Sequence, residues 1–211
     1  CKVRGLQVHG KSTKTARAGE RTAINLQGVE LEELTRGQVL STSGLLRSGH
    51  LIDVKLTLLP SAAKPLRNRS RVRLYHGTSE VVSRVIMPGR SELQPGETAY
   101  TQLRLEAPIL ALPGDRFIIR SYSPAVTIGG GSVVDVLTTK YHSRNASNVL
   151  AQMEALDTSS SLTRIEKLLG IAGPQGCDLA TLVARTGLPP GVVEETCEVL
   201  VKSKKATQIT R

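Results

Sequence analysis

The chain has 211 residues, 28 basic and 18 acidic side chains, a formal net charge of +10 at pH 7, four tyrosines, one phenylalanine and no tryptophan. The charge favours a polyanionic partner such as nucleic acid, while the scarcity of aromatic rings argues against a surface that stacks single-stranded bases. No apolar run approaches the ~20 residues of a membrane-spanning helix, so we expect a soluble, cytoplasmic protein with no membrane partner.

The basic excess lies mainly in the first two-thirds of the chain, with a net charge of +3 over residues 1–42, +5 over 43–139 and +2 over 140–211. A basic surface there would suit nucleic acid, although a generally basic soluble protein would show the same balance. The three cysteines, Cys1, Cys177 and Cys197, lie far apart with no C-x-x-C spacing and no histidines at ligand spacing. We therefore expect reduced thiols and no metal site.

The first motif is GLQVHGKST at residues 5–13, a formal match to the phosphate-binding pattern G-x-x-x-x-G-K-[ST]. That loop requires a buried strand before it and a helix starting at the Lys-Ser pair. Only four residues precede the motif here, the segment itself alternates loosely between apolar and polar residues, and no helical stripe follows. We therefore interpret GKST as the end of a strand and its turn, not as a nucleotide site.

Short stretches rich in alternating or β-branched residues follow, separated by turn signals at 88–90, 94–97 and 112–115. Such strands, recurring about every ten residues, predict an all-β barrel or sandwich for the first two-thirds of the chain. The predicted strands are 21–29, 51–59, 71–77, 80–87, 99–107, 116–122 and 130–137.

Arginines recur at every second position at Arg67, Arg69, Arg71 and Arg73. In an extended segment they would project from one side, about 6.6–7 Å apart, and could follow a phosphate backbone. The alternative is a solvated edge strand whose charge prevents self-pairing. The glycines at 129–131 are a second candidate phosphate site, but strands flank them and no helix follows, so close backbone packing is the preferred interpretation.

The tail changes character, with helical spacing in 146–156, 161–172, 177–187 and 189–202. Asp178 is placed as a helix cap and Gly187 as a helix stop, and 202–211 suggest a β-ribbon. Together these features predict a small α/β winged-helix module after a linker at 141–147. Its second helix carries Glu194, Glu195 and Glu198, which would repel DNA, so we expect this module to act as a spacer or protein contact.

The stretch RFIIRSYSPAVTIGGGSVVDVL at 116–137 resembles the end of the third domain of elongation-factor-Tu-like translational GTPases. Further segments resemble the bacterial selenocysteine-specific elongation factors (SelB) in particular. These segments are QLRLEAPILALPGDRF, HGTSEVVSRV, VRGLQVHGK and AGERTAINLQGVE.

The resemblance implies an internal part of such a factor: the C-terminal part of β-barrel domain 2 at 1–42, β-barrel domain 3 at 43–142, and a first winged helix at 143–211. The GTPase domain, with GTP and magnesium, would lie outside this chain, so no catalysis and no cofactor are expected within it. The implied partners are selenocysteine tRNA and the ribosome, with the messenger RNA hairpin bound only by further winged helices.

The resemblance also implies site residues. Arg21 matches an arginine lining the pocket for the selenocysteyl group, where a cation favours an ionised selenol over a neutral serine hydroxyl. Arg120, Ser121 and Tyr122 fall where these factors touch the T stem of tRNA, although the relatives carry an acidic residue and glycines there. Weaker candidates complete the predicted tRNA-binding set, namely His76, Thr78, Arg84 and the arginine row Arg67, Arg69, Arg71 and Arg73.

Two other functions remain open from the sequence. One is a winged-helix DNA-binding regulator with a β-barrel sensor, against which the three glutamates of the reading helix count. The other is an enzyme that uses 5–13 or 129–131 for nucleotide chemistry, although no acidic partner for a metal stands at suitable spacing and the four histidines are scattered.

Overall fold

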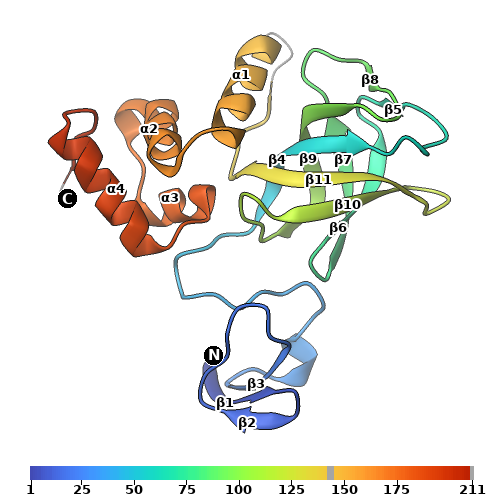
Figure 1. Ribbon diagram of the computed structural model, residues 1–211. Helices are drawn as coiled ribbons and strands as arrows, with labels where there is room; N and C mark the ends of the chain where they lie inside the picture. The colour runs from blue at the N-terminus through green and yellow to red at the C-terminus, as the bar shows by residue number, and fades with distance from the viewer. Residues whose placement is uncertain (142–144, 210–211) are drawn as a thin grey trace. The chain divides into compact units, whose positions relative to one another are not determined.

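The computed structural model describes residues 1–141 and 145–209 (Figure 1). The chain forms two compact units, Cys1–Gln38 and Val39–Arg211. The second unit combines a closed β-barrel with four C-terminal helices. The predicted fold class is mainly β, with β-barrel domains of the translation-factor type followed by a small α/β winged-helix domain. It is confirmed in its mainly β character, its closed barrel and its C-terminal helices.

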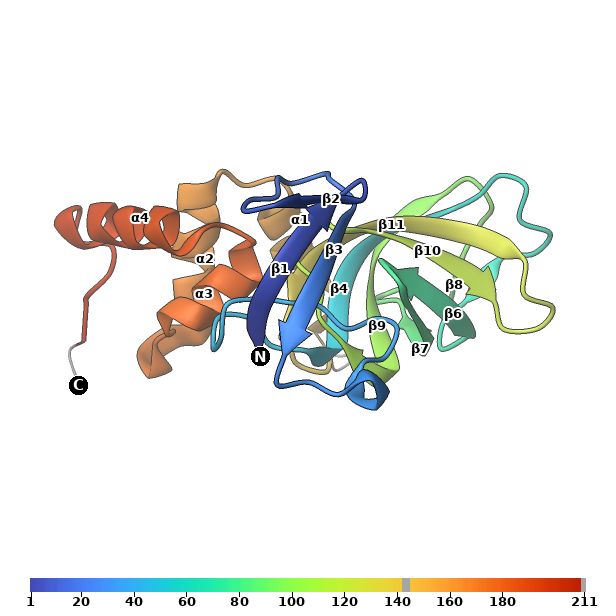
Figure 2. The ribbon, with the colours of Figure 1, turned by 90° about the horizontal axis from the view of Figure 1, so that it is seen from below.

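The first unit is an antiparallel sheet in the order β2-β1-β3 (Figure 2). Its elements are β1 Lys2–Val8, β2 Lys11–Thr13, β3 Thr22–Gln27 and a short 3-10 helix, η1 Leu31–Glu33. His9 and Gly10 join β1 to β2 with φ values of 50° and 77°. Two successive left-handed residues are typical of a tight two-residue hairpin turn. GLQVHGKST is therefore a β-hairpin, and a strand stands where a phosphate loop requires a helix.

This first unit has no enclosed core. Every residue from 1 to 38, all of which the structure describes, is exposed or half-buried. The cross-strand pair Leu6 and Ile24 lies on an apolar face, where Ile24 is 41% exposed. The strands β2 and β3 each have one unpaired edge within this sheet.

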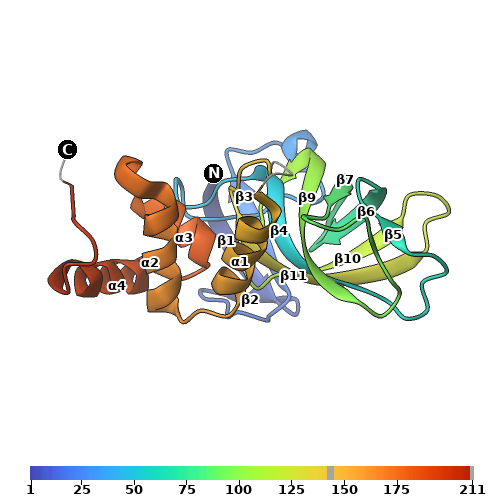
Figure 3. The same ribbon diagram turned by 90° about the horizontal axis from the view of Figure 1, so that it is seen from above.

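Six antiparallel strands close the barrel in the order β10-β11-β4-β9-β7-β6 (Figure 3). Each predicted strand of residues 51–137 is present, although β9 extends to Ile109. The barrel strands are β4 Gly49–Leu58, β6 Arg71–His76, β7 Ser79–Ile86, β9 Thr98–Ile109, β10 Arg116–Ser121 and β11 Thr127–Val136, and β5 Leu66–Arg67 pairs with β8 Glu92–Leu93 outside the barrel.

The glycine run lies within β11, where the strand packs closely against both of its neighbours. A Cβ atom at Gly130 would lie 2.5 Å from the carbonyl oxygen of Phe117 in β10. One at Gly131 would lie 1.9 Å from the carbonyl oxygen of Lys55 in β4. Glycine is required here because the backbones approach one another, which confirms the structural interpretation of the run.

The predicted row of four arginines is wrong as a single extended segment. Arg67 ends β5, while Arg69 has a φ of 67°, in the left-handed region, and belongs to a turn. The turn arises because Ser70 donates a backbone hydrogen bond to the carbonyl of Arg67. Only Arg71 and Arg73 share a strand, β6, where the alternating Val72 and Leu74 are buried as expected.

The helices begin and end close to their predicted positions. They are α1 Ala146–Asp157, α2 Ser161–Ala172, a short 3-10 helix η3 Gly173–Gln175, α3 Leu179–Thr186 and α4 Pro190–Lys202. The Asp178 carboxylate caps α3 by accepting a hydrogen bond from the Thr181 N–H, and Gly187 ends it with a φ of 71°. Both signals are confirmed.

The expected β-ribbon at 202–211 is not formed in the residues that the structure describes, which run to Ile209. Lys202 ends α4, Ser203–Lys205 turn, and the backbone of Lys205 bonds back to Leu200 of the helix instead of pairing with a strand. The predicted linker at 141–147 includes His142–Arg144, which lie outside the described residues, and α1 begins inside it. Among the described helices, none is long and apolar enough to cross a membrane.

Two buried arginines join the helices to the barrel. Arg185 of α3 donates two hydrogen bonds to the Asp135 carboxylate of β11, at 3.1 and 2.5 Å, and the Asp135 side chain is 2% exposed. Arg164 of α2 donates to the carbonyls of Leu156, Arg185 and Val134, at the ends of α1 and α3 and in β11. One guanidinium therefore satisfies carbonyl groups from three different elements.

Candidate nucleic-acid interface

The outward face of β6, β7 and β10 brings together five of the ten predicted tRNA-binding residues. Arg73 of β6 lies directly opposite Arg120 of β10, and Arg71 lies opposite Arg84 of β7. Because side chains alternate along a strand, these arginines point away from the core that Val72 and its neighbours fill. We call Arg71, Arg73, Arg84, Arg120, Tyr75 and Tyr122 the arginine face.

Tyr122 lies over the middle of the arginine face. Its ring centre is 4.5 Å from the Arg71 guanidinium carbon and 5.4 Å from that of Arg73. The Arg73 Nε also donates to the Tyr122 carbonyl at 3.2 Å. The loop that carries Tyr122 is closed by Ser121, whose hydroxyl accepts from the Val126 N–H at 3.1 Å. Cation–π contacts and this loop closure orient two guanidiniums side by side at the surface.

Two carboxylates pair with the same guanidiniums. Arg71 Nη2 lies 2.7 Å from Glu106 Oε1, and Arg73 Nη1 lies 2.8 Å from Glu80 Oε1. The hydrogen bond from Arg73 lowers the pKa of the Glu80 carboxyl, and the same bond raises the pKa of Arg73. The Glu80 carboxyl is therefore ionised at neutral pH and neutralises part of the charge of Arg73.

Arg120 is held differently. Its guanidinium lies 5.8 Å from the centre of the Tyr75 ring. Its Nε is buried and has no hydrogen-bond partner within residues 1–141 and 145–209. Because an unsatisfied buried donor is costly, this N–H would gain from donating a hydrogen bond to an anionic partner.

Among the other predicted residues, Arg84 belongs to the arginine face, and the rest lie beside this face or elsewhere. Arg84 Nη1 donates to the carbonyl of Arg69 at 3.0 Å, which fixes the turn beside the arginine face. His76 pairs with Asp115 at 2.9 Å, and Thr78 lies in the exposed hairpin turn between β6 and β7. Arg67 is exposed at the end of β5. The structure thus gathers four of the arginines and Tyr122, but not His76 or Arg67.

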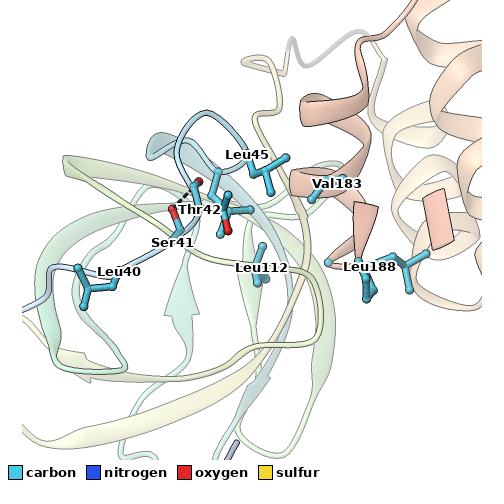
Figure 4. A pocket seen from close by; sticks show the side chains of 10 residues that line it. Leu40, Ser41, Thr42, Leu45, Leu112, Val183 and Leu188 are labelled. Carbon is cyan, nitrogen blue, oxygen red and sulfur yellow. Dashed lines mark hydrogen bonds between the residues drawn. The ribbon is translucent and has the colours of Figure 1, made fainter. Parts of the chain in front are cut away.

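An apolar pocket of about 340 Å³ lies elsewhere in the second unit (Figure 4). Its lining includes Leu45, Leu112, Val183 and Leu188, and none of its lining side chains is ionisable. Among the described residues there is likewise no cluster of histidine, cysteine or acidic side chains that could hold a metal ion. The arginine face is therefore the part of the described chain best suited to bind a charged partner.

Comparisons with known proteins agree with the β-barrel fold. Residues 53–140 match the family model for the β-barrel domain of the selenocysteine-specific elongation factor. The whole chain is 39% identical, over 215 aligned residues, to the selenocysteine-specific elongation factor of Desulfomicrobium baculatum. Over its whole length the chain is thus similar to part of a selenocysteine-specific elongation factor.

The chain spans only 33% of the length of the Desulfomicrobium baculatum relative. It also resembles the crystal structure of a bacterial selenocysteine-specific elongation factor, EF-Sec, with a TM-score of 0.67. That match covers 90% of this chain and 29% of the solved one, at 24% sequence identity, and it supports the fold. This similarity to an elongation factor favours the translation-factor interpretation over a DNA-binding regulator.

Arg21 lies in the first unit, immediately before β3, and its side chain is exposed. The sheet around it has no buried residue, so the described residues build no enclosed pocket at Arg21. Its role in binding the selenocysteyl group stays a prediction from the resemblance.

The sequence-based prediction missed Tyr75, Glu80 and Glu106. Tyr75 follows the same alternation as Arg71 and Arg73, and the two-residue turn at Gly77 and Thr78 sets Glu80 opposite Tyr75, so both could have been found. Glu106 could not, because it reaches Arg71 from β9, on the far side of β7 in the barrel order.

Proposed function

We propose that this chain is the tRNA-docking and connecting part of an elongation factor that delivers selenocysteyl-tRNA to the ribosome for selenocysteine incorporation. The observation that carries the proposal is the arginine face on the barrel of a chain that is similar, over its whole length, to part of a selenocysteine-specific elongation factor. Arg71, Arg73 and Arg120 would contact phosphates of the selenocysteine tRNA, and Tyr122 would hold the first two in place.

The chemistry of the face suits a duplex backbone better than single-stranded bases. A guanidinium offers a planar pair of donors that matches a phosphate. The two tyrosines of the face pack against arginines, so we assign their rings to orienting the guanidiniums and not to stacking bases. Contacts to phosphates position a duplex and carry no sequence information, so we expect discrimination between tRNAs to depend on shape.

Other parts of the proposed activity belong outside these residues. We infer that GTP and magnesium bind in a GTPase domain elsewhere in the full factor, and that the messenger RNA hairpin is bound by winged helices beyond α4. The full factor would act in the cytoplasm, at the ribosome. Arg21 would contribute to the selenocysteyl pocket only together with residues that this chain does not contain.

The proposal is tested by titrating the chain with selenocysteine tRNA, a standard elongator tRNA and a random DNA duplex of similar length, each at two salt concentrations. The expected result is preference for selenocysteine tRNA, with affinity that falls as salt rises. Each lost phosphate contact should reduce the slope of log affinity against log salt by about 0.7–0.9.

The matching variants are Arg73→Gln and Arg120→Gln, with Lys205→Gln as the control. Lys205 also forms an exposed ion pair, with Glu166 at 3.0 Å, and it follows the C-terminal end of α4. The two arginine variants should weaken tRNA binding, and the lysine variant should not. Equal weak binding of all three nucleic acids, unchanged in the arginine variants, would contradict the proposal, as would tight binding of the DNA duplex alone.

A further inference from the structure

The guanidiniums of Arg71 and Arg73 are already occupied in the free protein. Glu106 and Glu80 accept hydrogen bonds from them at 2.7 and 2.8 Å. A carboxylate and a phosphate present oxygens to the same pair of guanidinium donors. An anion that binds Arg71 or Arg73 through these donors must therefore displace the carboxylate or share the donor with it.

We propose that Glu80 and Glu106 are built-in competitors of RNA phosphate, which lower the affinity of the arginine face and make its binding selective for a polyanion that engages both arginines together. This inference rests on the proposed function. It assigns a role in specificity and release to two acidic residues that do not themselves bind RNA.

The geometry explains why the competition selects by length. A single phosphate that displaces Glu80 exchanges one ion pair for another at an exposed site, where such pairs contribute little. Arg71 and Arg73 lie two residues apart on β6, about 6.6–7 Å from each other along the strand. A nucleic-acid backbone can reach both arginines at once. The entropic cost of bringing the protein and the nucleic acid together then arises only once, although two ion pairs are exchanged.

The ring of Tyr122 makes the exchange reversible. It lies over both guanidiniums, so these can change partner without losing their orientation. The displaced carboxylates remain on β7 and β9, close to the bound phosphates, and repel them. The physical consequence is a higher dissociation rate and a smaller affinity for polyanions in general.

The test uses the full chain with Glu80→Gln, Glu106→Gln and both together. Glutamine keeps the size of the side chain but removes the charge. The matched control is Glu198→Gln, because Glu198 also forms an exposed ion pair, with Lys202 at 3.4 Å, on α4. The probes are selenocysteine tRNA, a short RNA duplex and a DNA duplex of the same sequence, with equilibrium affinity and dissociation rate measured for each.

The expected result is affinity for the RNA duplex that rises about threefold for each single variant and about tenfold for the double variant, mainly through slower dissociation. Discrimination against the DNA duplex should fall, and the control should behave as the original protein. The melting temperatures should stay unchanged, which would show that the fold is intact.

Failure of this inference differs from failure of the proposed function. If tRNA binds and Arg73→Gln weakens it, while both glutamate variants bind as the original does, competition by the carboxylates is refuted and the docking face stands. If Glu198→Gln raises affinity as much as the others, only net charge matters and the inference is wrong. If neither the original chain nor the double variant binds RNA, both proposals fail.

Discussion

Arginines occupy two contrasting regions of the barrel-containing unit. On the arginine face, the side chains of Arg71 and Arg73 are 40% and 35% exposed and pair with carboxylates that are themselves exposed. At the barrel–helix junction, Arg164 is 9% exposed and the Arg185 side chain 12%. The same residue type therefore meets very different dielectric surroundings within one compact unit.

This difference decides what each arginine can do. An exposed guanidinium keeps its water and can exchange one anion for another at small cost. A buried guanidinium has lost its hydration, so each of its donors needs a permanent partner. Arg164 and Arg185 have such partners in six hydrogen bonds to carbonyl and carboxylate oxygens, so we assign them to the fold and the arginine face to binding.

The largest expected effect comes from removing a junction arginine. Arg185→Ala leaves the Asp135 carboxylate buried without its partner, directly opposite the buried Asp53 in the neighbouring strand. We expect the free energy of unfolding to fall by about 3–5 kcal/mol. Urea unfolding of the variant beside the original chain measures this loss. If the free energy of unfolding fell no further than it does in Arg73→Gln, the two regions would not differ in their contribution to stability.

A smaller loss is expected in β11, which carries Asp135 of the junction and pairs with β10 of the arginine face. Gly131→Ala would place a methyl group 1.9 Å from the Lys55 carbonyl oxygen, so β11 and β4 must separate. We expect a destabilisation of about 3 kcal/mol and weaker tRNA binding, because β11 also supports β10. Gly170→Ala is the control, since its new methyl group meets nothing within 4 Å in helix α2 and should stabilise the chain slightly. Equal stability of the two variants would contradict the close packing.

The junction should also respond to pH in a way that the arginine face does not. Burial raises the pKa of the Asp53 carboxyl well above its usual range, and the charge of Asp135 raises it further. The folded chain therefore retains a proton that the unfolded chain releases near pH 3.9, so this group makes stability fall as the pH rises from there to the raised pKa.

Asp53→Asn should remove this fall, because asparagine has no proton to lose. The difference in unfolding free energy between variant and original should shift in favour of the variant as the pH increases from about 4 to 7. Thermal unfolding at several pH values checks it. A difference that stays constant across this range would show that Asp53 titrates in its ordinary range.

The smallest effect on stability is expected at the arginine face. Removing the pair by Arg73→Gln together with Glu80→Gln should leave the urea midpoint within error of the original, because both side chains are exposed. The same double variant should nevertheless bind tRNA less tightly. A clear loss of stability would mean that the pair is structural, like that of Arg185.

Several features could be predicted from the sequence because they depend on neighbours along the chain. The alternation in RVRLYH places Val72 and Leu74 inside and the arginines outside, whatever the rest of the barrel does. Asp178 and Gly187 bound α3 because capping involves only the adjacent turn. The glycines of β11 were rightly expected at a close backbone approach.

Other features depended on partners remote in the chain. The period-two arginines predicted one long row, but a turn at Arg69 breaks it, where the Arg69 N–H donates to the carbonyl of Val85 in β7. The carboxylate of Glu106 reaches Arg71 only because the barrel brings their strands together. Likewise, Arg164 and Arg185 look like ordinary helix-surface residues in the sequence. The sequence by itself determined where strands and helices lie, since that follows from local periodicity, whereas only the tertiary structure decided which arginines lost their water and which kept it.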